Sequence, residues 1–449
     1  MLKRFWSRYI GNLFFRPRFY VLVITASALF LFRYFLVWLG DIPFDFAGVV
    51  LMLFLSEYFL LFSKKEMFFA RRALAERLSN GDPNSISIFL ESKYRFPVHV
   101  QVVDEIPHQF QKRDVLFKLK MGIGKSERIQ YELRPVKRGE YEFGLINVYV
   151  STRLGLLQRR FKQGEHAKVP VYPSYLQMRK YQLMAISNRL SEVGVKKIRR
   201  IGHSIEFEQI KEYVRGDDYR TINWKATARK GQLMMNNYTD EKSQQIYCVI
   251  DKGRVMKMPF EELSLLDYAI NASLVLLNVA LLKQDKAGLI SFAEKISAFL
   301  PAEKKATQMQ SILELLYSQK TRYLESDFEK LYSAIRNRIT QRSLIVLFTN
   351  FESLSGMQRQ LPYLRRIAQH HLLLVVFFEN TELKQLIDQP AKDLETIYTK
   401  TIAEKFAFEK KLIVKELQRY GILTILTAPK NVTVNTLNKY LELKARQAI

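Results

Sequence analysis

The sequence predicts a multidomain protein with an N-terminal transmembrane helical hairpin, a β-sandwich-like middle domain and a C-terminal α/β domain of the Rossmann type. Three observations favour this fold class. Two long apolar runs stand close together near the start of the 449-residue chain. Short, partly alternating β-rich stretches follow them. Strands then alternate with helices to the end, which is typical of a mainly parallel sheet covered on both faces.

The first domain, residues 1–78, is expected to anchor the chain in a membrane. The runs 19–39 and 44–62 are each long enough, at about 1.5 Å per residue, to cross a hydrocarbon core of about 30 Å. Basic residues flank the pair, whereas the turn between the runs carries Asp41 and Asp45. The positive-inside rule therefore places both ends in the cytoplasm and the turn outside. The flanking basic residues are Lys3, Arg4, Arg8, Arg16, Arg18, Lys64, Lys65, Arg71 and Arg72.

Two charged residues interrupt the apolar runs. Arg33 is expected toward the outer end of the first helix and Glu57 toward the inner end of the second, so we do not expect them to pair. Snorkelling toward opposite interfaces is their simplest role. Residues 2–15 mix aromatic and basic side chains and are expected to lie at the interface as an amphipathic anchor helix. Helical character is expected to continue from the second run to about Leu78.

The composition limits the classes of partner. Lys and Arg total 70 against 44 acidic residues, a formal net charge of +26. This balance favours an anionic partner, either nucleic acid or an anionic membrane surface. Because part of this charge lies beside the predicted anchor, we expect the lipid bilayer as the partner and no nucleic acid. The single cysteine, Cys248, excludes intramolecular disulfides and multi-cysteine metal sites, which fits a reducing compartment.

The middle domain, residues 79–174, begins after the chain-breaking segment 80–84. Short β-rich stretches at regular spacing favour a small β-sandwich, which would mediate contacts or act as a spacer. The segment 122–125 is expected to be a hairpin turn, since a phosphate loop would need more glycines and a following helix. The β-rich stretches are 86–90, 98–103, 115–120, 128–134, 141–150, 156–161 and 169–172.

Residues 175–244 form a linker region rich in carboxylates, arginines and aromatic side chains. Bidentate Arg–carboxylate pairs would fix such a loop-rich segment, and this structural network is the favoured hypothesis. Adjacent carboxylates could instead bind a cation or act as acid and base, so a metal-dependent hydrolase stays as an alternative. Nucleic-acid binding is the least favoured. The carboxylates are Glu206, Asp217 and Asp218, and the arginines are Arg215, Arg220 and Arg229.

This linker region resembles the signature of a bacterial family known as domain of unknown function fifty-eight. The match has no gaps, and the resemblance extends to the paired N-terminal helices, the β-rich middle and the domain that follows. The matching positions are Gly202, Glu206, Phe207, Tyr213, Gly216, Asp217, Asp218, Arg220, Ile222, Trp224, Ala228 and Arg229.

The C-terminal domain, residues 245–449, presents polar residues where two predicted strands end. Ligands of open α/β sheets bind beyond the carboxyl ends of the strands. Asp251 follows the first strand, and Thr349 and Asn350 follow the strand at 343–348. The sequence therefore predicts that any ligand site of this domain lies around these positions.

The arrangement resembles a von Willebrand factor A domain, and this resemblance implies a metal-ion-dependent adhesion site. The first element of that site is Asp-x-Ser-x-Ser, and a later loop adds an aspartate. Here Asp251 is retained, but Gly253 and Val255 stand where the serines are expected, and Asn350 stands for the later aspartate. One carboxylate is a poor site for a hard divalent cation, so we expect a degenerate site without metal.

The same loop carries Lys252 and Arg254. The simplest role for both is a solvated loop. A sharper hypothesis is that they replace the metal when the domain binds an acidic residue of a partner.

The expected function is a non-enzymatic scaffold or adaptor at the inner (cytoplasmic) membrane of a bacterium, with its soluble domains in the cytoplasm. No catalytic residue and no cofactor are expected, since the sequence has no nucleophile elbow, phosphate loop or dinucleotide fingerprint. The family resemblance implies a MoxR-type AAA+ ATPase as partner, together with other membrane or envelope proteins. The implied role is in protein-complex assembly or cell-envelope maintenance.

Overall fold

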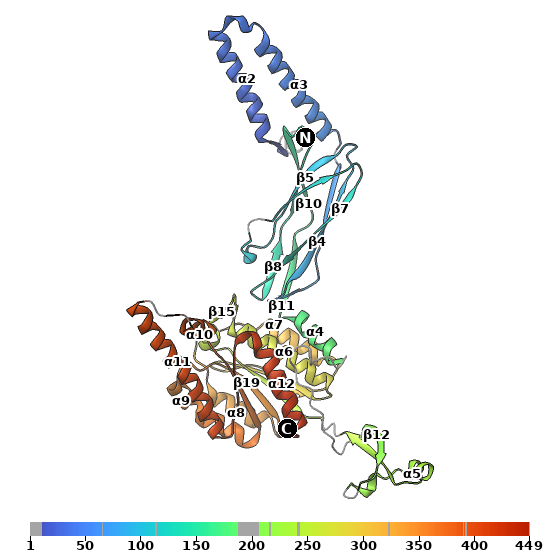
Figure 1. Cartoon of the computed structure of the whole chain (residues 1–449), viewed down its shortest axis with the longest axis vertical. Coiled ribbons are helices and arrows are strands. Elements are labelled where there is room, and N and C mark those ends of the chain that lie inside the picture. Colours follow the sequence, from blue (N-terminus) through green and yellow to red (C-terminus); the bar gives the residue numbers. More distant parts are fainter. Residues whose placement is uncertain are drawn as a thin grey trace. The chain divides into compact units, whose positions relative to one another are not determined.

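The protein is described by a computed structural model in which the chain forms two compact units, Met1–Val171 and Tyr172–Ile449 (Figure 1). Each unit is treated separately below. The structure describes residues 11–64, 66–112, 115–186, 206–214, 217–239, 243–321, 324–388, 390 and 393–448.

Two apolar helices, α2 (Pro17–Phe35) and α3 (Ile42–Phe62), form a hairpin at the start of the first unit (Figure 1). Their 19 and 21 residues correspond to about 28 and 32 Å of helix. A short 3-10 turn, η1 (Val37–Leu39), joins them with Gly40, whose φ of +50° suits glycine. The first α-helix therefore ends at Phe35, four residues before the end of the predicted run.

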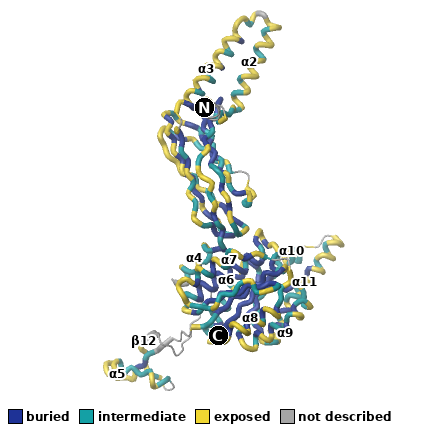
Figure 2. The backbone as a smooth tube through the Cα atoms, turned by 180° about the vertical axis from the view of Figure 1, so that it is seen from behind, coloured by how far each residue is buried: buried dark blue, intermediate teal, exposed yellow. Residues whose placement is uncertain are grey.

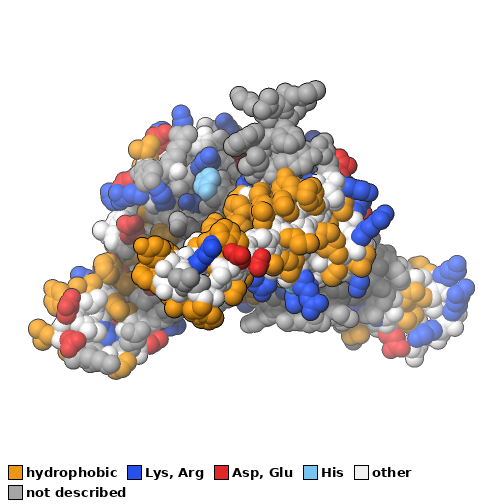
Figure 3. Space-filling model, turned by 90° about the horizontal axis from the view of Figure 1, so that it is seen from above, with side chains coloured by type: hydrophobic (Ala, Val, Ile, Leu, Met, Phe, Trp, Pro, Cys, Tyr) orange, Lys and Arg blue, Asp and Glu red, His pale blue; other side chains and the backbone are white. Residues whose placement is uncertain are grey.

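Within the part of the chain that the structure describes, three helices are long and apolar enough to cross a membrane, and they differ in how far they are buried. None of the apolar window of α2 and 17% of that of α3 is buried, whereas 83% is buried for α6 (Leu265–Leu282). The apolar character of α6 is explained by its place in a protein core. Figure 3, which looks down on the hairpin, shows a face dominated by hydrophobic side chains.

The expected helices on either side of the hairpin are wrong where the structure describes them. β1 (Leu13–Phe15) is a strand that pairs with β10 (Leu157–Gln163). β2 (Phe68–Ala73) pairs with β4 (Asn84–Ser92), and Phe68 and Ala70 are buried while Arg71 is exposed. This period of two is that of a half-buried strand. The first ten residues lie outside the described part.

The β-rich part of the first unit contains three sheets, and its first strands precede the predicted boundary at residue 79. Their orders are β1-β10-β9-β5-β6, β2-β4-β7 and β3-β11-β8. The first two share one apolar core with the base of α3, and the third closes a smaller core. The remaining strands are β3 (Leu78–Ser79), β5 (Val98–Asp104), β6 (Leu116–Met121), β7 (Ser126–Leu133), β8 (Gly139–Phe143), β9 (Ile146–Ser151) and β11 (Ala167–Tyr172).

Two local expectations for this part change. The turn at 122–125 joins β6 to β7, which belong to different sheets, so it is not the turn of a hairpin. The stretch 141–150 belongs to two strands, β8 and β9, which are separated at Gly144 and Leu145. The carboxylate of Glu105 accepts there from the N–H of Leu145 at 2.9 Å. A Cβ at Gly144 would meet this carboxylate, so glycine is required for the close approach.

Glu57 does not snorkel. It is fully buried where α3 meets the loop before β10. Its carboxylate accepts from the hydroxyl of Thr152 at 2.6 Å and from the backbone N–H groups of Leu156 and Leu157 at 2.9 and 3.2 Å. Glu57 therefore fastens the second apolar helix to the β-rich part. Arg33 does lie near the turn, 3.6 Å from Asp41.

Arg159 fixes the end of α3 from the β side. Its Nη1 donates to the carbonyls of Leu61 at 2.6 Å and Lys64 at 2.8 Å, groups that the helix itself leaves without partners. The guanidinium also lies over the rings of Phe62 and Phe161, 4.8 and 4.5 Å from their centroids. The hairpin is thus bonded to the β-rich part through both side chain and backbone.

The second unit contains a six-stranded sheet in the order β18-β17-β14-β19-β20-β21. All neighbours are parallel except β18, which lies antiparallel at one edge. In chain order this is 3-2-1-4-5-6, so the direction of winding reverses between β14 and β19. The strands are β14 (Gln245–Asp251), β17 (Lys286–Phe292), β18 (Ile296–Glu303), β19 (Leu344–Phe348), β20 (Leu372–Phe378) and β21 (Leu423–Thr427).

Helices cover both faces of this sheet, which is why its central strands are apolar throughout (Figure 2). α4, α6, α7 and α12 pack on one face, and α8, α9 and α11 on the other. The helices besides α6 are α4 (Tyr175–Ile186), α7 (Gln308–Tyr317), α8 (Phe328–Arg338), α9 (Leu354–His370), α10 (Thr381–Asp388), α11 (Leu394–Arg419) and α12 (Val432–Ala445).

The linker region contributes a small separate element. β12 (Glu206–Glu212) and β13 (Met234–Thr239) pair antiparallel, and α5 (Trp224–Lys230) lies in the segment between them. Asn223 caps α5 by accepting from the N–H of Ala226 at 3.0 Å, and Gly231 ends it with a φ of +69°.

Candidate functional site

The carboxyl ends of β14 and β19 bring the predicted polar residues together. These two strands flank the point where the winding reverses, which is where ligands of such sheets bind. Asp251 is 1% exposed, and its Oδ2 accepts from the hydroxyl of Thr349 at 2.7 Å. Its Oδ1 accepts from the N–H of Gly253 at 2.8 Å and from the hydroxyl of Ser326. Both carboxylate oxygens are therefore already engaged within the domain.

The residues at this position do not fit a divalent cation. Burial raises the pKa of Asp251, although hydrogen bonds from Ser326, Thr349 and Gly253 oppose the shift. A Cβ at Gly253 would lie 2.2 Å from Oγ of Ser326, so a serine cannot be restored there without displacing that hydroxyl. Hard cations need several oxygen ligands with carboxylates among them. Here one carboxylate is satisfied by hydroxyl and amide donors instead.

Lys410 supplies a cation that the sequence did not single out. Its Nζ donates to Oδ1 of Asn350 at 2.7 Å, and it lies over the ring of Phe377. Burial lowers the pKa of Lys410 to about 8, while the carboxylate of Glu352 opposes the shift. Nothing in the sequence distinguishes Lys410 from the adjacent Lys411, because only the fold brings α11 across the end of β19.

The two basic residues of the first loop behave differently from each other. Arg254 is exposed, as expected for a solvated loop, but Lys252 is only 5% exposed. The backbone N–H of Lys252 donates to the carbonyl of Phe292 at 2.8 Å, which ties this loop to the end of β17. The cationic side chain placed against Asn350 is that of Lys410, on a distant helix.

Replacing Lys410 with methionine is expected to stabilise the α/β domain at neutral pH. The unfolded chain holds this proton up to a pH of about 10.5, whereas the folded protein releases it near 8. Between these values the unfolded state binds more protons, so the cost of the buried charge is largest below pH 8 and shrinks as pH rises. We expect a gain on the order of 1–2 kcal/mol at pH 7, after the lost bond to Asn350 and partial exposure are allowed for, and little at pH 10.

Urea unfolding followed by alkylation of Cys248 measures this effect in one domain. Cys248 is 0% exposed, and burial raises the pKa of its thiol to about 12, so only unfolded chains react. The exposed neighbour gives a matched control, Lys411→Met. An equal gain in stability in both variants would contradict the assignment of Lys410 as a costly buried charge. So would a gain that does not change between pH 7 and 10.

The linker element holds the other candidate carboxylates, and each is engaged locally. Asp217 accepts from the N–H of Val214 at 3.0 Å and lies 3.3 Å from Nζ of Lys211. Asp218 accepts from the backbone N–H of Arg220 at 3.0 Å and caps the short turn η4 (Tyr219–Thr221). Among the described residues, these partners are a lysine and backbone amides; Arg215, one of the expected arginines, lies outside the described part of the chain.

Several signature positions are not described by the structure. Gly202 and Gly216 lie outside the described residues, as do the side chains of Glu206 and Phe207. Within the described part of the chain, no group of three or more His, Cys, Asp or Glu side chains is arranged to hold a metal ion. The hydrolase alternative built on Glu206, Asp217 and Asp218 stays a prediction, because the side chain of Glu206 lies outside the described residues.

The described part of the linker region around the signature exposes large side chains. Tyr219 is 68% exposed and Trp224 is 70% exposed, and Val214 is 64% exposed beside them in sequence. Arg220 lies over the ring of Tyr219, 5.8 Å from its centroid. Ile222 forms an isolated bridge with Met235, so the backbone of this segment is fixed while its aromatic side chains stay in solvent. Exposed aromatic residues next to arginine are typical of protein interfaces.

Known proteins similar to this chain include one curated relative and several solved structures. The chain is 26% identical over 231 residues to the uncharacterized protein YeaD of Bacillus subtilis (strain 168), covering 50% of this chain and 55% of the relative. It thus spans about half the length of that relative.

Two of the solved structures are a von Willebrand factor A domain and a conserved hypothetical protein. The SpRpn10 VWA domain is 9% identical, covering 43% of this chain and 93% of its own, with a TM-score of 0.28. The hypothetical protein BatB from Bacteroides thetaiotaomicron is 13% identical, covering 46% of this chain and all of its own, with a TM-score of 0.32. The strand order of the sheet, 3-2-1-4-5-6, follows from the strand pairing of this chain and does not depend on these similarities.

The match to a protein family falls on the linker element and most of the α/β domain. Residues 209–405 match the family described as "Protein of unknown function DUF58". This segment includes Asp217, Asp218, Arg220 and Trp224 of the signature, and the polar residues around Asp251 and Asn350. The resemblance seen in the sequence is confirmed for residues 209–405, which are similar to the DUF58 family.

Proposed function

We propose that this protein is a membrane-anchored, non-enzymatic scaffold that presents its linker element and α/β domain to protein partners in the bacterial cytoplasm. The observation that carries the proposal is the polar cluster at the ligand-binding edge of the sheet. The carboxylate of Asp251 accepts from Thr349 and Ser326, and beside it Lys410 donates to Asn350. Hydrogen bonds of this kind within the domain stabilise a surface, whereas catalysis and metal binding need groups left free for a ligand.

The proposed anchor is the hairpin of α2 and α3. Its helices match the thickness of a bilayer, and their apolar side chains are largely unburied. Aromatic residues at the turn end, Tyr34 and Trp38, are 84% and 79% exposed, and Tyr20 at the other end is 54% exposed. Exposed aromatic side chains at both ends of a helix pair are typical of membrane interfaces. We infer the inner membrane, with the turn outside, from the basic flanks.

Cysteine labelling of intact cells tests this topology. The native Cys248 is buried, so it is not expected to give background labelling. An impermeant maleimide is expected to label Asp41→Cys, at the turn, in intact spheroplasts. It should label Lys305→Cys, an exposed position of the α/β domain, only after lysis. Labelling of Lys305→Cys before lysis would contradict the proposed topology. Recovery of the unlabelled protein in the soluble fraction would contradict the proposed anchor.

The proposed partner is a MoxR-type AAA+ ATPase, and the implied role is in complex assembly or envelope maintenance. The family resemblance supports this partner, and the exposed Tyr219 and Trp224 within the DUF58 segment supply a contact surface. Cross-linking and affinity purification from detergent extracts, with and without ATP, should recover such an ATPase. Trp224→Ala is expected to reduce recovery, whereas Trp38→Ala, an equally exposed tryptophan of the anchor, should not. No AAA+ protein above background would overturn the assignment.

A further inference from the structure

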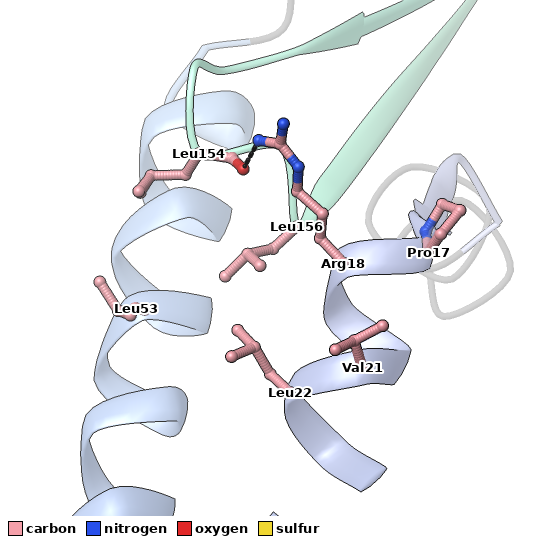
Figure 4. A pocket seen from close by; sticks show the side chains of 7 residues that line it. All are labelled: Pro17, Arg18, Val21, Leu22, Leu53, Leu154 and Leu156. Atoms are coloured by element: carbon pink, nitrogen blue, oxygen red, sulfur yellow. Dashed lines mark hydrogen bonds between the residues drawn. The ribbon is translucent and has the colours of Figure 1, made fainter. Parts of the chain in front are cut away.

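A cavity of about 470 Å³ opens between the two apolar helices at their base (Figure 4). Leu22 of α2 and Leu156 of the loop before β10 point toward each other in this space (Figure 4), and Leu53 of α3 also lines it. Its volume falls within the range of about 300–1,000 Å³ that is usual for ligand sites. The lining is almost wholly apolar and consists of Pro17, Arg18, Val21, Leu22, Leu53, Leu154 and Leu156.

Arg18 lines this cavity, and Arg16 lies beside it, since both guanidinium groups approach Gly155. Arg18 Nη1 donates to the carbonyl of Leu154 at 2.9 Å, and Arg16 Nη1 donates to the hydroxyl of Ser151 at 3.2 Å. Gly155 allows their approach: a Cβ at this glycine would lie 3.0 Å from Arg16 Nη1 and 3.6 Å from Arg18 Nη1. Its φ of +69° also suits glycine. The two guanidinium groups are therefore held over the same point of the backbone.

No carboxylate among the described residues forms an ion pair with either arginine. The acidic residue of the neighbouring turn, Glu57, is fully buried, and its oxygens accept from Thr152, Leu156 and Leu157. Two like charges held together repel each other, so the arrangement is electrostatically completed by an anion. Guanidinium groups bind phosphate through parallel N–H donors.

Aromatic rings mark the depth of the cavity along the helices. Phe15 and Phe19 stack with their centroids 4.6 Å apart, and Phe19 lies 5.7 Å from Phe54 across the hairpin. Phe15 is 42% exposed and Tyr20 is 54% exposed. Aromatic side chains gather where headgroups meet acyl chains. An apolar cavity with a basic mouth at this depth matches the two ends of a phospholipid, and basic pockets between helices on the cytoplasmic side bind anionic headgroups.

We propose that this cavity binds one anionic glycerophospholipid, with an acyl chain against Leu22, Leu53 and Leu156 and the phosphate on Arg16 and Arg18. The site rests on the proposed membrane placement of the hairpin. The site lies at the junction between the anchor and the β-rich part, since the loop that carries Leu154 and Leu156 leads directly into β10. A bound lipid would then fill the junction that Glu57 and Arg159 hold together.

The test measures lipid retention by the full-length protein. Delipidated protein in detergent is mixed with phosphatidylglycerol, with phosphatidylcholine or with inorganic phosphate, and bound molecules are counted by native mass spectrometry. The wild type is expected to retain phosphatidylglycerol. Arg18→Gln should lower the preference for phosphatidylglycerol over phosphatidylcholine about tenfold, since a hydrogen bond to a charged group is removed. Leu22→Trp should fill the cavity and lose both lipids.

Matched controls separate the site from general effects. Leu31→Trp adds the same bulk to a side chain of α2 that is 68% exposed, and Arg359→Gln removes an exposed charge of α9. Both should retain lipid as the wild type does. Equal retention of the two lipids by the wild type, or no change in Arg18→Gln, would overturn recognition of an anionic headgroup. Retention by Leu22→Trp at the level of Leu31→Trp would overturn the cavity.

Two further outcomes identify what has failed. If inorganic phosphate displaces phosphatidylglycerol and gives the same thermal stabilisation, the site takes free phosphate and the lipid assignment is wrong. If lipid is not retained while Asp41→Cys is still labelled from outside, the anchor stands and only the lipid site is wrong. Melting temperatures of the variants, measured in parallel, show whether Leu22→Trp and Arg18→Gln are folded, and Arg18→Gln tests the headgroup contact without adding bulk to the cavity.

Discussion

Replacing Glu57 with leucine is expected to loosen the junction between the anchor and the β-rich part, although it makes α3 more apolar. The backbone N–H groups of Leu156 and Leu157 would lose their acceptor, as would the hydroxyl of Thr152. Each buried donor left unsatisfied costs about 1–3 kcal/mol. With two backbone donors stranded, we expect a loss of roughly 2–4 kcal/mol, or ~30- to ~700-fold in the local opening equilibrium.

Hydrogen–deuterium exchange of the amides of Leu156 and Leu157 measures this opening directly, because both N–H groups donate to Glu57. Asp45→Asn is the matched control, since it removes an exposed carboxylate from the other end of the same helix. The control should leave both amides as protected as in the wild type. If Glu57 merely snorkelled to the interface, Glu57→Leu would insert as well or better and exchange would not change.

The elements of this protein that depend on local sequence could be predicted. Apolar runs of about 20 residues became α2 and α3, and the alternation of strands with helices became the six-stranded sheet. Asp251 and Thr349 were predicted to lie at one edge because parallel strands end on the same side, and their side chains are 2.7 Å apart. Period and strand direction are sufficient for such expectations.

What could not be predicted depends on contacts between distant parts of the chain. Lys410 reaches Asn350 across 60 residues, and Glu57 reaches Thr152 across 95. Nothing in their own neighbourhoods marks them, because a buried charge is recognised by its partners and not by its flanks. The short strand β1 was missed for the same reason, since three aromatic-rich residues become a strand only beside β10.

These long-range contacts share a physical consequence for the proposed scaffold. Glu57 and Arg159 join the apolar hairpin to the β-rich part with hydrogen bonds to backbone groups, so the two move as one body at this junction. In the α/β domain, Lys410 joins α11 to the end of β19. Bonds of this kind transmit position from one element to the next, which is what a scaffold requires and what a flexible tether would lose.

Replacing Arg72 with methionine is expected to produce the largest loss of stability in the β-rich part. Sequence alone assigns Arg72 to the basic flank of the anchor, but its side chain is 5% exposed and pairs with the fully buried carboxylate of Asp104. The hydroxyl of Tyr131 also donates to this carboxylate, and Arg72 Nη1 donates to the carbonyl of Gly144 at 3.0 Å. Breaking a buried pair by removing one partner costs about 3–5 kcal/mol, because the other charge stays buried.

Arg71→Met is the matched control, since Arg71 is the exposed neighbour on the same strand and carries the same topological charge. It should change the free energy of unfolding by no more than about 0.5 kcal/mol. The double variant Arg72→Met/Asp104→Leu removes both charges and should recover much of the loss, because apolar replacement of a whole buried pair is often neutral. Amide exchange of β4 and β5 in the full-length protein measures all three. Similar losses for Arg71→Met and Arg72→Met would mean that both arginines act only as flanking charges of the anchor.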